Sequence, residues 1–298
     1  MSLAIFFAAL AGLLYGILSL VYKYADRIKA RSAQFTFVLS ITAALVTFVK
    51  SRSEESYWGA PLLWTAGVGM AVVIVLGIYV IMAANRLGPV YSSWTMVNVS
   101  FLFAIFLSAV ILHEKLLCVD PINLFLFCLT LFFFLKGMRA GAGNSRQNRN
   151  FIHLFALLGV FVTNGLTTFG SKLKYVFFGS ANTSAFATVF YLLSALITLI
   201  LILAQKNRPL FTRHEIKSGA LGGICMSTAT ILFLSAMALP AAAVFTITQG
   251  MSLTTGVALT TIVGKERLNS WMAVGLFLGA VVLVAVVFRE QVAVWLCD

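Results

Sequence analysis

The chain has very little charge for its length. Only 10% of its 298 residues are Asp, Glu, Lys or Arg, whereas 61% are hydrophobic and the mean hydropathy is +1.00. A soluble domain carries about a quarter charged residues, so this composition excludes an ordinary soluble fold. Apolar runs of about twenty residues, enough to cross a bilayer as a helix, recur along the whole chain. We predict an all-α integral membrane protein with ten spans, at 3–22, 33–49, 61–83, 91–112, 119–138, 151–171, 182–204, 218–238, 241–263 and 270–288.

Acidic residues are absent from the interior of these spans. All nine Asp and Glu lie in loops or at the ends of the predicted helices. A pump that exchanges protons for cationic drugs needs a titratable carboxylate at membrane depth. The sequence therefore disfavours cation/proton antiport by that mechanism.

Metal-binding and nucleotide-binding patterns are also lacking. The four cysteines show neither metal-ligand spacing nor a disulfide framework, and no two of the three histidines have zinc-ligand spacing. No Gly-rich phosphate loop is present. The net charge of +12 comes from Lys and Arg in short loops without neighbouring stacking aromatics, which excludes nucleic acid as a partner. We expect no cofactor, no metal and no enzymatic activity.

A charged tetrapeptide motif occurs twice, about half a chain apart. His-Glu-Lys-Leu (113–116) ends one apolar run and Lys-Glu-Arg-Leu (265–268) ends another. A polar, basic, Gly-rich connector lies between the two copies. The pattern predicts a five-helix repeat at 1–138, a connector at 139–150, a second five-helix repeat at 151–290 and a tail at 291–298. Because five is odd, the two repeats enter the membrane in opposite directions, as in many secondary transporters.

The positions of the basic residues predict the orientation. Most of the 21 Lys and Arg follow the first, third, fifth, seventh and ninth spans. The positive-inside rule then places both termini outside the cytoplasm and the connector in it. Compactness and the lack of sorting tails favour a bacterial inner membrane.

The chain resembles the drug/metabolite transporter superfamily in its ten-helix, EamA-like form. The resemblance rests on Gly-Lys-Glu-Arg-Leu (264–268) with the run 272–283, on the weaker copy at 113–116, and on Tyr-Gly-Ile-Leu-Ser-Leu-Val-Tyr-Lys (15–23). It implies transport of small metabolites through a central cavity lined mainly by spans 1, 3, 4, 6, 8 and 9, with spans 5 and 10 as packing. Such proteins often carry proline where this chain has Asn98 and Gly250.

Amides within apolar spans are the first candidates for a binding site. Asn98, Gln249 and Asn164 each need another helix or a wet cavity, because an unpaired amide in hydrocarbon is costly. Contacts between helices would also satisfy them. Asn98 and Gln249 occupy nearly equivalent points of the two repeats, which favours the cavity.

Aromatic residues complete the predicted site. Tyr15 and Tyr79 lie inside spans and can bind an apolar group, whereas Trp94 suits either an interfacial belt or a substrate wall. Together these residues suggest a neutral or zwitterionic, amino-acid-like substrate with an apolar part. The predicted substrate-binding residues are Asn98, Gln249, Asn164, Tyr15, Tyr79 and Trp94.

Glu114 and Glu266 have two interpretations, as structural charges at helix ends or as gate residues. The leading hypothesis for the whole chain is a secondary transporter that works by alternating access. The alternative is an integral-membrane enzyme acting on lipid-like substrates. The expected partners are a small-molecule substrate and the lipid bilayer, and a fused ten-helix chain can enclose its cavity as a monomer.

Overall fold

The computed structural model describes residues 2–54, 58, 61–87, 90–114, 119–140, 147–179, 181–205, 211–264, 270–288, 291 and 293. Within these ranges the chain is helical, with one short 3-10 helix (η1) and no strand. The described residues do not include the second charged motif, at 265–268, or the end of the first, at 115–116. The helices are α1 (Ser2–Arg27), α2 (Ser32–Ser51), α3 (Pro61–Leu87), α4 (Val90–Val99), α5 (Phe101–Ile111), α6 (Val119–Ala140), α7 (Gln147–Phe178), α8 (Thr183–Leu203), α9 (Arg213–Ser235), η1 (Ala236–Ala238), α10 (Ala241–Gly264) and α11 (Ser270–Val287).

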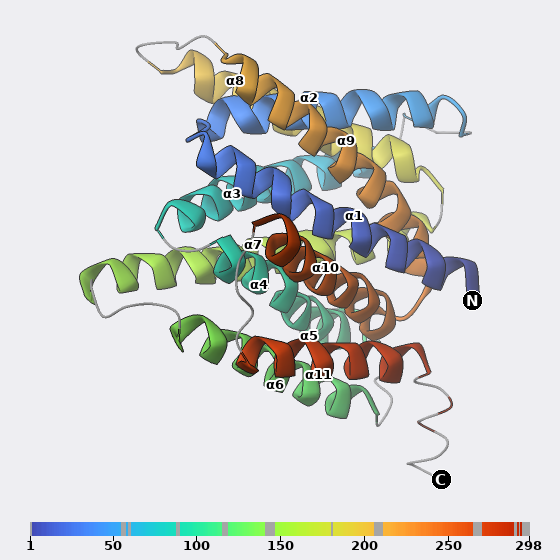
Figure 1. The fold of residues 1–298 in the computed structure, drawn as a ribbon. Helices are drawn as coiled ribbons and strands as arrows, with labels where there is room; N and C mark the ends of the chain where they lie inside the picture. Colours follow the sequence, from blue (N-terminus) through green and yellow to red (C-terminus); the bar gives the residue numbers. More distant parts are fainter. Residues whose placement is uncertain are drawn as a thin grey trace.

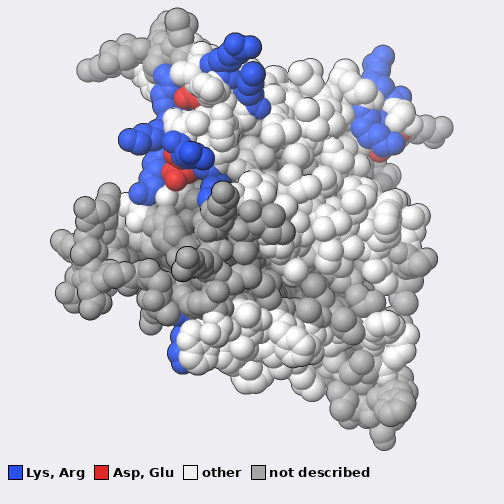
Figure 2. All heavy atoms as spheres, viewed as in Figure 1, with Lys and Arg blue, Asp and Glu red and all other residues white. Residues whose placement is uncertain are grey.

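Five of the described helical segments are long and apolar enough to cross a membrane: Leu3–Arg27, Ser32–Ser51, Pro61–Leu87, Thr183–Leu203 and Arg213–Ala238. Large apolar side chains are also exposed, among them Phe155 at 71%, Phe277 at 70% and Ile200 at 65%. In Figure 2 Lys and Arg gather at the left edge, where Figure 1 shows α1 ending and α2 and α9 beginning, and in a second cluster at the upper right, where α2 ends; the described residues between these clusters show no charge on this face. An uncharged apolar belt between charged ends is compatible with a membrane protein.

The helices pack as an interleaved bundle (Figure 1). Helix α1 lies against α9 and α10, and α7 lies against α3, α4 and α5. Helix α2 contacts α8 and α9. Helices α6 and α11 pair with each other, with the rings of Phe133 and Trp271 stacked at 5.8 Å and Lys136 Nζ 3.8 Å from the Trp271 ring centroid.

The predicted span 91–112 is one apolar run, but it is interrupted at Ser100 between α4 and α5. No proline is present there. Instead, Ser100 Oγ donates to the Val97 carbonyl at 2.6 Å, and the Asn164 amide nitrogen of α7 donates to Val97 O at 2.9 Å and to Ser100 Oγ at 2.6 Å. Polar side chains that insert into a helical ladder are a recognised cause of kinks, so Asn164 and Ser100 supply the break without proline.

Small residues let the helices approach closely. A Cβ at Gly12 of α1 would come within 2.4 Å of the Thr248 carbonyl oxygen of α10. On α9, a Cβ at Gly223 would meet the Leu39 carbonyl oxygen of α2 at 2.6 Å. The Gly12–Gly16 and Gly219–Gly223 pairs visible in the sequence are therefore packing seams, as small residues are in membrane bundles.

Hydrogen bonds connect α2 to α9 at its start and to α8 at its end. Thr188, in the second turn of α8, donates to Thr47, near the end of α2, at 3.0 Å. At the start of α2, Glu215 of α9 accepts from the backbone nitrogen of Arg31, the N-cap of α2, at 3.0 Å, and from its guanidinium at 2.9 and 2.7 Å. These hydrogen bonds raise the pKa of Arg31 above its usual value. At the other end Glu54 accepts from Ser184 N at 3.2 Å and Ser184 Oγ at 2.7 Å, in the first turn of α8.

Candidate functional site

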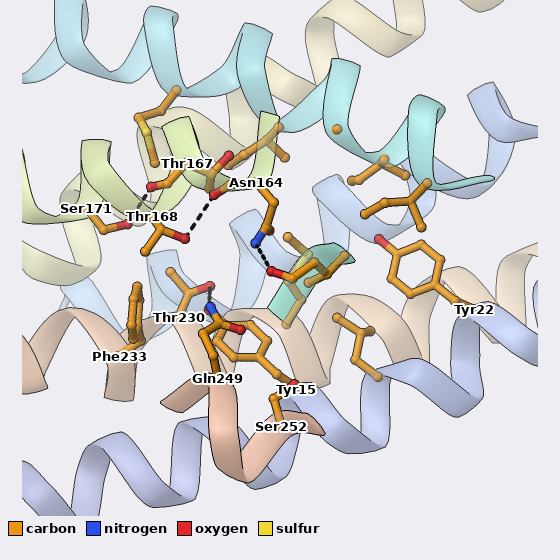
Figure 3. Close-up of a pocket in the computed structure, with 18 of the residues that line it drawn as sticks. Tyr15, Tyr22, Asn164, Thr167, Thr168, Ser171, Thr230, Phe233, Gln249 and Ser252 are labelled. Carbon is orange, nitrogen blue, oxygen red and sulfur yellow. Dashed lines mark hydrogen bonds between the residues drawn. The ribbon is translucent and has the colours of Figure 1, made fainter. Parts of the chain in front are cut away.

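A cavity of about 100 Å³ lies in the centre of the bundle. Its lining residues come from α1, α3 and α4 in the first half of the chain and from α7, α8, α9 and α10 in the second. Figure 3 shows side chains from these helices converging on the space. No described lining residue belongs to α6 or α11. About 10–15 Å³ of such space holds one water, so the cavity has room for several waters or a small molecule.

The cavity wall is aromatic and aliphatic, with a set of neutral polar groups. None of its described lining residues carries a formal charge. The aromatic lining consists of Tyr15, Tyr22, Trp94, Phe190, Tyr191 and Phe233. The polar lining consists of Asn164, Thr167, Thr168, Ser171, Thr230, Gln249 and Ser252. Mostly apolar walls with a few convergent polar groups are typical of small-molecule sites.

Two tyrosines are fixed by one threonine of α9. Thr230 Oγ1 lies 3.2 Å from the Tyr15 hydroxyl of α1 and 2.7 Å from the Tyr191 hydroxyl of α8. The Tyr15 ring also meets Phe233 edge-on at 6.2 Å. This hydrogen-bonded group joins three helices, so it holds the aromatic wall in a defined position.

Four of the six residues predicted to bind substrate line the cavity: Gln249, Asn164, Tyr15 and Trp94. Asn98 and Tyr79 are not among its lining residues. Asn98 is fully buried in α4, where its amide nitrogen donates to Trp94 O at 2.7 Å and its oxygen has no partner. The buried Tyr79 hydroxyl also has no partner. A role of Asn98 and Tyr79 in binding stays a prediction.

The sequence interpretation overlooked the hydroxyl residues of α7. Thr167, Thr168 and Ser171 line the cavity together with Asn164. Residues three, four and seven positions after Asn164 share its helix face, so the helical period alone could have found them. Ser252 was also missed; it lies three positions after Gln249, on the same side of α10.

An ion pair involves a buried lysine that follows a cavity-lining residue in the sequence. Lys172 follows the lining residue Ser171, and its Nζ lies 2.8 Å from Glu114 Oε1. Lys172 also donates to Leu239 O at 3.0 Å and Met237 O at 3.5 Å. Both carboxylate oxygens of Glu114 accept from the backbone nitrogen of Ala241, at 3.3 Å each. Glu114 thus contacts the second half of the chain through both Lys172 and Ala241.

Comparisons with known proteins identify a similar fold but no function. No protein-family model matches the chain, and no curated protein matches its sequence. A solved structure described only as "Crystal structure of protein" superposes with a TM-score of 0.75 at 17% identity, and the match covers all of both chains. The helical arrangement is therefore one that a solved structure also has. Within the described residues, no group of three or more His, Cys, Asp or Glu could hold a metal ion.

Proposed function

We propose that the chain is a secondary transporter that moves a small neutral or zwitterionic metabolite, amino-acid-like with an apolar part, across a membrane by alternating access. The observation that carries this proposal is the central cavity, which is built from both halves of the chain and lined by aromatic and uncharged polar groups. Transporters built from repeats hold their substrate between the repeats, near the middle of the membrane. A neutral wall suits a cargo without net charge, because an uncompensated charge would be desolvated there.

The helix contacts support two inverted five-helix repeats. In the proposed repeats, the helices at equivalent positions are α1 and α7, α2 and α8, α3 and α9, α4–α5 and α10, and α6 and α11. Helix α1 packs against α9 and α10, and α7 packs correspondingly against α3 and α4–α5. The pairs α2–α8 and α6–α11 each join a helix to its own counterpart.

The hydrogen bonds of Glu54 and Glu215 follow the same pairing of helices with their counterparts. Glu54 follows α2 and contacts the first turn of α8, whereas Glu215, in the first turn of α9, contacts the N-cap of α2. The proposal also includes ten membrane spans, membership of the drug/metabolite transporter superfamily in its EamA-like form, and a location in a bacterial inner membrane.

Transport in liposomes tests the proposal. Purified protein should move at least one member of a panel of small amino acids and related metabolites down its gradient, measured by mass spectrometry. Gln249→Leu should reduce that transport about tenfold or more, because it removes a cavity amide without opening a void. Thr248→Val is the matched control: Thr248 lies next to Gln249 but donates to Ala8 O instead of lining the cavity. Absence of transport for the whole panel, or full activity in Gln249→Leu, would contradict the proposal.

A further inference from the structure

Two neighbouring helices carry a cluster of positive charge at one end of the bundle. Helix α1 ends at Arg27, α9 begins at Arg213, and the two helices pack against each other. The hydroxyl of Tyr24 lies 3.2 Å from Nδ1 of His214, and both side chains are exposed, so the two helix ends meet at the surface of the protein. Four exposed cations flank this contact in the sequence and are called the basic surface below: Arg27, Lys29, Arg213 and Lys217. Figure 2 shows mostly Lys and Arg at this edge.

The acidic residues of this region are already engaged. Glu215 is buried and accepts from the guanidinium and from the backbone nitrogen of Arg31. Asp26 is only partly exposed, and its charge interacts with that of Arg86. Among the described residues, no ion pair joins the basic surface to a carboxylate. The basic surface therefore has positive charge available for an anionic partner.

Exposed apolar side chains continue along both helices, away from the basic surface. On α9, the exposed Leu221 and Ile224 follow Lys217 by about one and two turns. On α1, the exposed Ile17 precedes Tyr24 by about two turns. Residues at these spacings share a helix face, so polar and apolar exposed groups occupy the same side of each helix. Because both helices belong to segments that are long and apolar enough to cross a membrane, the basic surface lies where headgroups would meet hydrocarbon.

We infer that the basic surface binds the headgroup of an anionic phospholipid, whose acyl chains lie along α1 and α9 against Ile17, Leu221 and Ile224. The lipid phosphate supplies the negative charge that the four cations lack, and Tyr24 suits the boundary between headgroups and hydrocarbon. A soluble anion would contact only the cations, whereas a lipid also covers the apolar side chains on the same helix faces. The inference goes beyond the proposed function, because binding of this lipid does not depend on any cargo.

Competition for a fluorescent phosphatidylglycerol tests the inference with the purified full-length protein, freed of lipid, in detergent micelles. Energy transfer from the tryptophans of the protein reports the bound probe. The competitors are phosphatidylglycerol and phosphatidylcholine with identical acyl chains, glycerol phosphate as a headgroup without chains, and polyglutamate in place of an acidic protein. Phosphatidylglycerol should compete about tenfold or more strongly than phosphatidylcholine, because only the former has a net negative charge. High salt should reduce this preference, because exposed charges are screened.

Two charge-matched double variants locate the site. Arg213→Gln with Lys217→Gln should weaken phosphatidylglycerol binding about tenfold or more and leave phosphatidylcholine binding unchanged. Lys50→Gln with Arg52→Gln is the matched control, because it removes the same charge from two exposed cations at the far end of α2. This control should keep the preference of the wild type. Thermal unfolding without lipid checks that both variants are folded.

Four results would each overturn the inference. They are equal competition by the two phospholipids, competition by glycerol phosphate as strong as by phosphatidylglycerol, stronger competition by polyglutamate, and equal losses in the two double variants. The last of these would show a response to net charge instead of a site at α1 and α9. The proposed function is scored separately in liposomes. Lipid preference without transport rejects the proposed function alone, and transport without lipid preference rejects this inference alone.

Discussion

Removing the charge of Glu114 should destabilise the protein more than removing the charge of Lys172. The two side chains form an ion pair at 2.8 Å, but their environments differ: the Lys172 side chain is 6% exposed and the Glu114 side chain 26%. Glu114→Gln leaves a deeply buried ammonium without the Glu114 carboxylate, beside the carbonyls of Met237 and Leu239 and the Tyr175 ring. Breaking a buried pair in this way costs about 3–5 kcal/mol.

The magnitudes follow from these surroundings. Glutamine keeps an amide oxygen that can accept from Lys172, so we expect the loss for Glu114→Gln to lie near the lower limit, about 3 kcal/mol. Lys172→Met removes the buried charge and leaves Glu114 partly exposed, with the backbone nitrogen of Ala241 as a hydrogen-bond donor. We expect this variant to lose about 1–2 kcal/mol. The double variant should lose less than the sum of the two, with a coupling energy of about 1–2 kcal/mol.

Reversible unfolding in mixed micelles, followed by circular dichroism, measures these free energies. All four proteins of the cycle should be compared in the same detergent at the same pH. Equal losses in the two single variants would refute the argument from unequal burial. Additive losses would show that the two side chains do not act as a pair.

Three further predictions concern packing, the hydrogen bonds at the start of α2 and orientation. Gly223→Ala should destabilise the bundle by about 1–3 kcal/mol, because its Cβ would overlap the Leu39 carbonyl of α2; Gly69→Ala, which has no neighbour within 4 Å, should cause no loss, as the unfolding free energies will test. Glu215→Gln should loosen the start of α2, because an amide cannot accept from Arg31 and Thr212 at both of its terminal atoms; faster hydrogen exchange of the first turns of α2 than in the wild type is the expected readout, and unchanged exchange would contradict it. A reporter fused after Asp298 should report a location outside the cytoplasm, and a cytoplasmic signal would reverse the predicted orientation.

The sequence predicted the helices well because long apolar runs leave the backbone little alternative to helix formation in a membrane. The predicted spans at 33–49 and 182–204 lie close to α2 and α8. The interruption at Ser100 was not predicted. It depends on Asn164, 64 residues later in the chain, and a local pattern carries no information about such a partner.

Only part of the candidate site was predicted, because a rule based on single residues cannot show which of them border the cavity. An amide in an apolar run must face something polar, and this rule led to Gln249 and Asn164, which line the cavity. The same rule led to Asn98, which instead donates to the Trp94 carbonyl of its own helix. Which of several inward-facing polar residues borders open space depends on how the helices are rotated against one another.

The sequence alone determined that the chain is helical, apolar and without acidic groups inside its predicted spans, because these properties follow from composition and from the period of single segments. The tertiary structure alone decided which residues meet. It brought Glu114 to Lys172 and Tyr15 to Thr230, and it placed the hydroxyls of α7 and the amide of Gln249 around one cavity. Close packing is the physical reason, because the contacts between side chains distant in sequence depend on how whole helices fit together.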